Sequence, residues 1–170
     1  MRKISVIGLG NVGSTVAHTL IERHLCEKLA LFDKKEGKVI AEVNDLSDSL
    51  VRRNNNVELI KGNKKDLADS DIIVFAPGDI KILHTNSDRL AEFKYTKTCV
   101  EEWAPIIKDS GFKGIIISIT NPCDVIAEYM QKLTGLPKER VIGSGTIIDT
   151  ARMKNTVAKA LDISPDSVDG

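Results

Sequence analysis

Three glycines near the start of the chain have the spacing of a phosphate-binding turn. Gly8, Gly10 and Gly13 form G-x-G-x-x-G in "VIGLGNVG", directly after an apolar run and before apolar residues at helical spacing. Glycines in this pattern permit a tight turn, backbone contact with a pyrophosphate, and close helix–strand packing. The N-terminus of the following helix adds free N–H groups and a positive dipole end. The pattern predicts dinucleotide contacts at Gly8, Gly10, Asn11, Val12 and Gly13.

An aspartate follows at the distance that ribose recognition requires. Asp33 ends the second apolar run, 20 residues after Gly13. An acidic residue at this place accepts hydrogen bonds from the adenosine ribose, and its charge repels a 2′-phosphate, so NAD is predicted over NADP. Lys34 and Lys35 weaken that preference, because a neighbouring cation can tolerate the phosphate. The alternative is a structural glycine turn beside a solvated aspartate; the matching context favours the cofactor interpretation.

A second pair of candidate residues lies further along the chain. Asp149 and Arg152 are three residues apart in "GTIIDTARMKN", which predicts that both side chains share one face of a helix. They form either a surface ion pair, which contributes roughly a few tenths of a kcal/mol, or part of a reaction centre. The spacing alone leaves both interpretations open.

Two loops follow predicted strands and end in helix-starting residues. In "FAPGDIKILHTNSDR", Gly78 is a candidate hinge of a lid, and Arg89 is either a solvated helix charge or a group that swings inward to polarise a carbonyl. In "SITNPCD", Asn121 can cap a helix with Pro122 in its first turn. Asn121 also falls where the strand ends meet the expected cofactor crevice, and we favour the interpretation that its amide contacts nicotinamide ribose and substrate.

These residues must be positioned by alternating strands and helices. Short, continuously apolar runs predict strands that are covered on both faces. They are Ile4–Ile7, Leu29–Phe32, Val57–Ile60, Ile72–Phe75, Ile115–Ile119 and Val141–Ile142. Helices are predicted over Val12–Leu25, Lys38–Leu50, Asp88–Lys108, Pro122–Leu133 and Ile147–Leu161, with a further helix start at Ser164. The alternation predicts an α/β fold with a doubly wound parallel sheet of the Rossmann type.

Composition narrows the class of protein. The 170 residues include 24 basic and 24 acidic side chains, which argues against nucleic acid as a partner. No apolar run reaches the roughly 18 residues of a membrane span, and the N-terminus is a poor signal peptide. Cys26, Cys99 and Cys123 are too far apart for a zinc site and odd in number for a disulfide framework, so no metal is expected. A cytoplasmic protein is the prediction.

Five motifs together resemble the L-lactate/malate dehydrogenase family, in particular its bacterial L-lactate and L-2-hydroxyisocaproate members. The motifs are "IGLGNVG", Asp33, the lid arginine of "NSDR", "ITNPCD" and "GTIIDTARM", in the family's order. The resemblance covers the whole chain. It implies an NAD-binding Rossmann domain over residues 1–142, followed at 143–170 by the first helix of a substrate domain that is cut short. A homo-oligomer is implied for the full-length protein.

The resemblance also implies a role for each candidate side chain. Arg89 polarises the ketone, Asn121 orients the substrate, Arg152 clamps its carboxylate, and Asp149 holds a catalytic histidine. In the family that histidine lies further along than Gly170, so the chain alone is expected to be inactive. His18 and His24, on the predicted helix after the glycine turn, and His84, in the lid, do not fit that position.

The sequence departs from the family's pattern in two places. Ala76-Pro77-Gly78 stands where the family commonly has T-A-G. The region that selects the substrate side chain holds Lys81, Ile82, Leu83 and His84, and its apolar members favour lactate or a bulkier aliphatic 2-hydroxy acid, or the corresponding 2-keto acid. The alternatives are a malate dehydrogenase, a non-catalytic dinucleotide-sensing module, and a scaffold that binds nothing.

Overall fold

Six parallel strands form one sheet in the order β3-β2-β1-β4-β5-β6. The computed structural model describes residues 2–51, 56–79 and 89–169, with the backbone alone for 89–91. The strands are β1 (Lys3–Ile7), β2 (Lys28–Phe32), β3 (Glu58–Lys61), β4 (Ile72–Phe75), β5 (Ile115–Ser118) and β6 (Val141–Gly143). The order reverses between β1 and β4, so the carboxyl ends of these neighbouring strands open a crevice. The predicted doubly wound α/β fold is confirmed.

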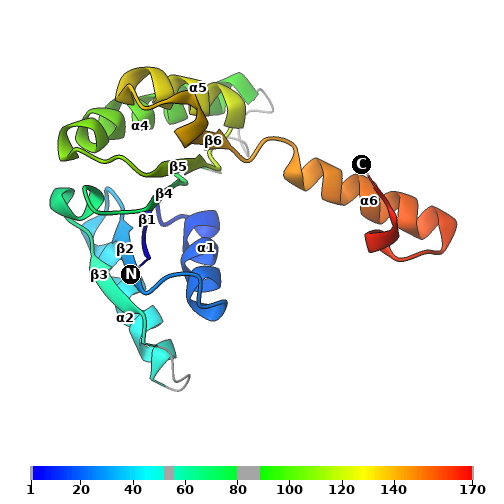
Figure 1. Cartoon of the computed structure of the whole chain (residues 1–170), viewed down its shortest axis with the longest axis horizontal. Coiled ribbons are helices and arrows are strands. Elements are labelled where there is room, and N and C mark those ends of the chain that lie inside the picture. The colour runs from blue at the N-terminus through cyan, green and yellow to red at the C-terminus, as the bar shows by residue number, and fades with distance from the viewer. Residues whose placement is uncertain (1, 52–55, 80–88, 170) are drawn as a thin grey trace.

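Helices cover both faces of this sheet (Figure 1). They are α1 (Asn11–Glu22), α2 (Glu36–Leu50), α4 (Arg89–Ser110) and α5 (Cys123–Thr134), with α6 (Ile147–Leu161) after the last strand and 3-10 turns η1 (Lys64–Leu67), η2 (Lys138–Arg140) and η3 (Pro165–Ser167). The five α-helices and six strands lie within a few residues of their predicted bounds. The helix start predicted at Ser164 is a single 3-10 turn, capped by the Ser164 hydroxyl.

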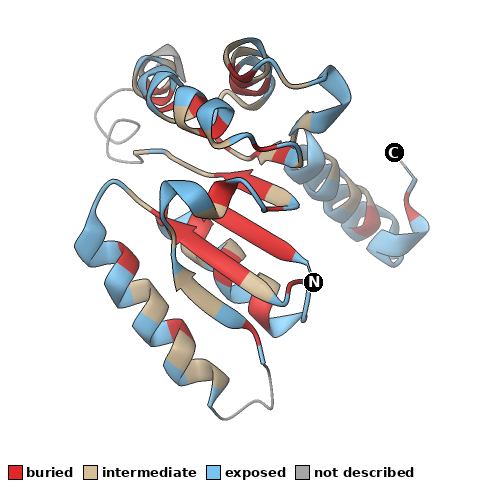
Figure 2. Ribbon diagram, turned by 60° about the vertical axis from the view of Figure 1, so that its left-hand side comes forward, coloured by how far each residue is buried: buried red, intermediate tan, exposed pale blue. Residues whose placement is uncertain are grey.

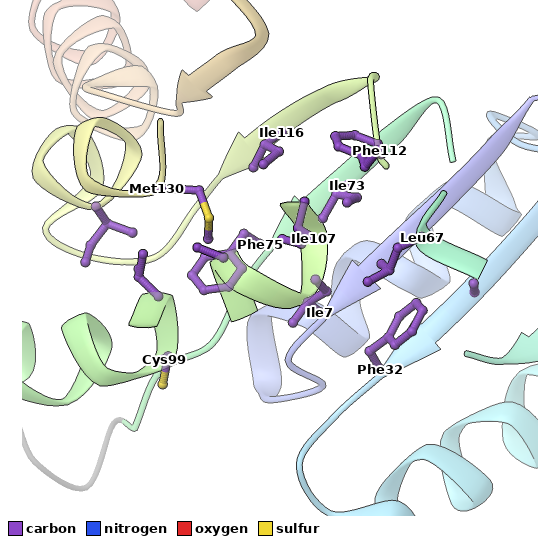
Figure 3. Packing of buried hydrophobic residues seen from close by; sticks show 14 residues of the cluster. Ile7, Phe32, Leu67, Ile73, Phe75, Cys99, Ile107, Phe112, Ile116 and Met130 are labelled. Carbon is purple, nitrogen blue, oxygen red and sulfur yellow. The ribbon is translucent and has the colours of Figure 1, made fainter. Parts of the chain in front are cut away.

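Alternate residues of the strands enter two separate cores. Val6, with Leu29 and Leu31, packs toward α1 and α2. Ile7, with Phe75, packs toward α4 and α5. Figure 3 shows the second core, where Ile7, Phe75 and Ile107 lie at the centre and Met130 reaches them from α5. Because successive side chains of a strand point to opposite faces, continuous apolar runs fill both cores.

One buried residue of the sheet is a lysine, which the apolar pattern did not predict. Lys3 begins β1 and is 3% exposed. Its ammonium lies 3.4 Å from a carboxylate oxygen of Asp66 and also contacts Asp69, while its backbone N–H donates to Asp71. The hydrogen bond from Lys3 lowers the pKa of the Asp69 carboxyl. Carboxylates from the β3–β4 connection therefore make a buried cation tolerable at this end of the sheet.

The alternative interpretation, in which Asn121 caps the helix after β5, is contradicted by the structure. The helix begins at Cys123, and Pro122 occupies the capping position with extended backbone (φ −70°, ψ 118°) and no side-chain cap. The Asn121–Pro122 peptide bond is cis. Asn121 is therefore one residue too far from the helix, and its exposed amide is left for other contacts.

Helix α6 stands away from the sheet and its covering helices (Figures 1 and 2). Ile147 is 69% exposed, Ile148 63% and Leu161 63%. Ala158 is the buried residue of this helix in the described part of the chain. These exposed apolar side chains leave an uncovered surface on α6, and a surface of this kind favours self-association. Across the described residues, none of the helices is long and apolar enough to cross a membrane.

Candidate functional site

The glycine turn lies at the carboxyl end of β1 and leads directly into α1. Gly8 has φ +89°, a conformation that L side chains rarely adopt, and a Cβ there would lie 2.7 Å from the backbone nitrogen of Pro77. A Cβ on Gly13 would lie 1.8 Å from the carbonyl oxygen of Gly8. The protein's own packing therefore requires glycine at both positions.

Gly10 differs from these two glycines. Its φ is −68°, which any residue can adopt, and no atom lies within 4 Å of a Cβ built there. Gly10 occupies the capping position of α1, where no side chain caps the first turn. The space in front of the helix N-terminus is open, because Gly10 has no side chain to fill it. An anion can approach the first N–H groups of α1 at this point.

Asp33 is bound to the turn that it was predicted to complement. One carboxylate oxygen accepts a hydrogen bond from the Leu9 N–H at 2.8 Å, and the other accepts from the Lys35 N–H at 2.9 Å. The side chain therefore links the glycine turn to the start of α2. Two carboxylate oxygens have about four acceptor positions between them. Both retain capacity for ligand hydroxyl groups, so Asp33 is more than a solvated charge.

Two hollows meet in front of the glycine turn. One, of about 230 Å³, includes Asp33 in its lining, and the other, of about 350 Å³, includes Asn121. Both are lined by Gly10, Ala76, Pro77, Gly78 and Asp79. The two hollows therefore adjoin along the strand ends, and together they are called the groove, with the carboxylate in one part and the amide in the other. A two-part ligand such as a dinucleotide fits this layout, with its linking phosphates near Gly10.

The floor of the groove is the segment Ala76-Pro77-Gly78, which follows β4. The hydroxyl of Thr120 donates to the carbonyl oxygen of Pro77 at 2.8 Å and lies 3.2 Å from that of Phe75. Thr120 is 3% exposed. It thereby fixes the segment after β4 to the segment after β5. Pro77 in turn lies against Gly8, so the departure from T-A-G is accommodated by direct packing.

The structure brings most of the predicted cofactor residues to this groove. Gly8 and Asp33 line its first part, Asn11, Val12 and Asn121 line its second part, and Gly10 and Gly78 line both. Gly13 lies beneath the turn, against Gly8. Their roles in binding stay predictions, since geometry alone shows only their place.

The predicted lid falls largely outside the described residues. Arg89 begins α4, but its side chain is not described, and neither are residues 80–88 with Lys81, Ile82, Leu83 and His84. The proposed contact between Arg89 and a carbonyl is therefore untested.

Asp149 and Arg152 lie on one face of α6, as predicted. The guanidinium nitrogen of Arg152 donates to a carboxylate oxygen of Asp149 at 3.1 Å. The side chains of Arg152 and Asp149 are 74% and 69% exposed. Neither residue lines the groove beside Gly10, because α6 projects away from the sheet (Figure 1). Their assignment to a reaction centre stays a prediction.

Sequence reasoning missed several residues of the first hollow. They are Lys38, Tyr95, Cys99, Glu102 and Trp103, most of them on α4. Burial raises the pKa of the Cys99 thiol, so this side chain is a neutral part of the wall at physiological pH. Lys34 Nζ donates to the Tyr95 hydroxyl at 2.7 Å. No local motif marks Tyr95, because it reaches the site through the packing of α4.

A larger hollow, of about 530 Å³, lies at the opposite end of the strands beside Arg2, His24 and Cys26. Burial raises the pKa of the Cys26 thiol to about 11, which leaves it protonated and unreactive. Ligands of open parallel sheets bind at the carboxyl ends of the strands. We therefore place the site at the groove near Gly10.

The strand order, the glycine turn and the carboxylate after β2 define a dinucleotide-binding domain of the Rossmann class. Comparison with known families refines this class. Residues 2–143 match the model described as "lactate/malate dehydrogenase, NAD binding domain". The chain belongs to this family, and the predicted cofactor, NAD, is confirmed at this level.

Individual relatives agree with the family. L-lactate dehydrogenase 1 of Bifidobacterium longum is 35% identical over 168 residues, which cover 99% of this chain and 52% of that protein. The minor L-lactate dehydrogenase of Enterococcus mundtii, in a ligand-bound crystal structure, has a TM-score of 0.89 at 29% identity, covering 99% and 53% of the two chains. The lactate dehydrogenase of Cryptosporidium parvum, complexed with lactic acid and NAD, has a TM-score of 0.88 at 26% identity, covering 99% and 52%. The chain spans about half the length of these relatives.

Proposed function

We propose that this chain is the NAD-binding part of an L-2-hydroxyacid dehydrogenase that transfers a hydride between NAD(H) and lactate/pyruvate or a bulkier aliphatic 2-hydroxy/2-keto acid. The observation that carries this proposal is the pair of adjoining hollows that share Gly10, with Asp33 in the lining of one and Asn121 in the lining of the other. Its layout supports a bound dinucleotide whose reactive half lies beside the segments after β4 and β5.

The residues of the groove have distinct proposed tasks. Asp33 accepts hydrogen bonds from the ribose hydroxyls while its own bonds to Leu9 and Lys35 hold it in place. Gly8, Gly10, Asn11, Val12 and Gly13 form the turn that approaches the phosphates. Gly78 lines both halves of the groove, and Asn121 contacts the nicotinamide ribose. When bound, the cofactor supplies the hydride chemistry, and the protein positions it.

On the substrate side, Arg89 is proposed to polarise the ketone oxygen and Asn121 to orient the substrate. Arg152 is proposed to clamp the substrate carboxylate, which suits the planar fork of a guanidinium. Asp149 is proposed to orient a histidine that exchanges the hydroxyl proton. The described histidines do not fit that role: His18 lies on α1 and His24 directly after it. The relatives extend to about twice this length, and we assign the acid/base to the half that this chain does not match.

We propose a domain boundary after residue 142, with residues 143–170 opening the substrate domain. The departure of α6 from the sheet after β6 and its exposed apolar face support this division. For the full-length enzyme we propose a cytoplasmic homo-oligomer with small-molecule partners and no nucleic acid. The equal numbers of acidic and basic side chains support the last point.

Malate dehydrogenase is the second candidate within the same family. It has less support, because the relatives reported above are lactate dehydrogenases. A full-length enzyme that contains this chain should reduce pyruvate or 2-ketoisocaproate with NADH faster than oxaloacetate. A clear preference for oxaloacetate would overturn the substrate assignment but leave the cofactor site standing.

Cofactor binding is tested on the 170-residue chain itself. Calorimetry should detect NADH binding, and Gly10→Ala should weaken it about tenfold, because the methyl group enters the space reserved for the phosphates. Gly37→Ala is the matched control: Gly37 also lies in the first turn of a helix, with nothing within 4 Å of a Cβ. Absence of NADH binding by the parent chain would refute the sensor and the dehydrogenase proposals together. Appreciable pyruvate reduction by this chain alone would refute the assignment of the acid/base elsewhere.

A further inference from the structure

Two residues that line the first hollow, Lys34 and Tyr95, are joined by a hydrogen bond. Lys34 follows the ribose carboxylate Asp33 directly in sequence, whereas Tyr95 lies on α4, 61 positions further along the chain. Lys34 Nζ donates to the Tyr95 hydroxyl at 2.7 Å and lies 4.9 Å from the centre of the ring. Both side chains line the hollow that contains Asp33. The pair therefore connects the loop after β2 to α4 along the wall of this hollow.

The position of this lysine matters because of the charge beside it. A carboxylate that receives ribose hydroxyls repels a 2′-phosphate, and a cation next to it removes that repulsion. The hydrogen bond to Tyr95 raises the pKa of Lys34, so the ammonium stays charged. Its charge is nevertheless directed to the tyrosine hydroxyl and ring, which are good partners for an ammonium.

We propose, on the basis of the proposed function, that Tyr95 is a specificity-determining residue of the cofactor site. By holding Lys34 Nζ on α4, Tyr95 withholds this cation from a 2′-phosphate and keeps the Asp33 hollow selective for NAD(H). Lys34 would bind the 2′-phosphate of NADP(H) if its ammonium were free, and the hydrogen bond to Tyr95 holds it away from that position. Tyr95 acts through Lys34, so its effect depends on the lysine.

The test compares the dissociation constants of NADH and NADPH for the 170-residue chain, each measured by calorimetry or nucleotide fluorescence. Tyr95→Phe keeps the ring and removes the hydroxyl that accepts from Lys34. The ratio of the NADPH to the NADH dissociation constant should fall about threefold to fivefold, in keeping with one exposed charge contact. The ratio is the readout, because a general effect on the hollow would change both dissociation constants together.

Two further variants separate this inference from a general effect on the wall. In the Lys34→Met background, Tyr95→Phe should leave the ratio unchanged. Tyr129→Phe is the matched control. The Tyr129 hydroxyl also makes a side-chain hydrogen bond, which it donates to Glu101, and Lys97 Nζ lies 5.9 Å from its ring centre, but Tyr129 lies on α5 and does not line the hollow. It should leave the ratio at the parent value.

The outcomes are distinguishable. An unchanged ratio in Tyr95→Phe, or a change of the ratio that persists without Lys34, would contradict the proposed role of Tyr95. The proposed function would still stand in that case, provided that the parent chain binds NADH. Failure of the parent chain to bind either reduced nucleotide overturns both. A ratio that falls only while Lys34 is present supports the inference.

Discussion

The two regions that carry the proposed functional residues are held in opposite ways. Around the glycine turn, Gly8 lies against Pro77, and Asp33 accepts two backbone hydrogen bonds. On α6, Asp149 and Arg152 contact each other and are more than two-thirds exposed. The groove beside Gly10 is thus built by the domain's own core, whereas the proposed substrate-binding side chains of α6 have no such support within the described residues. Under the proposed function, the first region binds by itself and the second acts only against another surface.

The largest effect should come from filling the turn. Gly13→Ala places a methyl group 1.8 Å from the Gly8 carbonyl oxygen, so the backbone of the turn must move. We expect a loss of about 3 kcal/mol in the free energy of unfolding, measured by urea denaturation. Gly37→Ala is the control and should stabilise by about 0.5–1 kcal/mol, because its helical site is open. Equal stability of the Gly13 variant and the parent would show that the groove is not fixed by the core.

The second effect concerns the link between the segments after β4 and β5. Thr120→Val keeps the shape of the side chain but leaves the Pro77 carbonyl without its hydroxyl donor. We expect a loss of about 1–2 kcal/mol in stability. The substitution should also weaken the binding of NADH more than it weakens the binding of ADP-ribose, because the proposed nicotinamide half of the groove rests on this segment. Thr120→Ser retains the hydroxyl and should restore most of both properties; if it behaves like valine, the hydrogen bond is not the cause.

The sequence was sufficient for the parts of the molecule that depend on local pattern. Continuous apolar runs located all six strands, and the glycine spacing with Asp33 located the turn. The start of β1 was missed because Lys3 is charged, and its partner Asp66 lies 63 positions away. The alternative in which Asn121 caps α5 failed for a local reason: Pro122 itself takes the capping position, which a pattern of capping residues does not reveal.

The part of the site that sequence did not predict is tertiary in origin. Tyr95 belongs to no motif, and Thr120 lies in "ITNPCD" but had no role predicted there. Each acts on the groove through a hydrogen bond to a residue more than 40 positions away. Their types are common on helices and at strand ends, so their spacing carries no signal. Asp33 was predicted as a ligand, but its second task, binding the Leu9 N–H, follows only from the folded turn.

A smaller effect is expected at the end of the sheet opposite the groove. Lys3 lowers the pKa of Asp69, so the folded state favours the ionised carboxyl. The stabilisation is complete above the unfolded pKa near 4 and is lost as pH falls through the lower, folded pKa. Asp69 is largely exposed, so the contribution should be below about 1 kcal/mol. The stability difference between the parent and Asp69→Asn should be present at pH 6 and shrink as the pH is lowered below about 4; a difference independent of pH would exclude the ion pair as its source.

The smallest effect on stability should come from the residues with the largest proposed role in catalysis. Asp149→Asn or Arg152→Gln removes a largely exposed ion pair, so the free energy of unfolding of the 170 residues should change by less than about 0.5 kcal/mol. In a full-length enzyme the same substitutions should lower kcat/KM by at least about 100-fold, since they remove the carboxylate clamp or the orientation of the histidine. A loss of stability without a loss of activity would contradict this comparison between the glycine turn and α6, and it would give the ion pair of α6 a structural role. The expected pattern, full stability and lost turnover, is that of side chains whose partners lie on another surface.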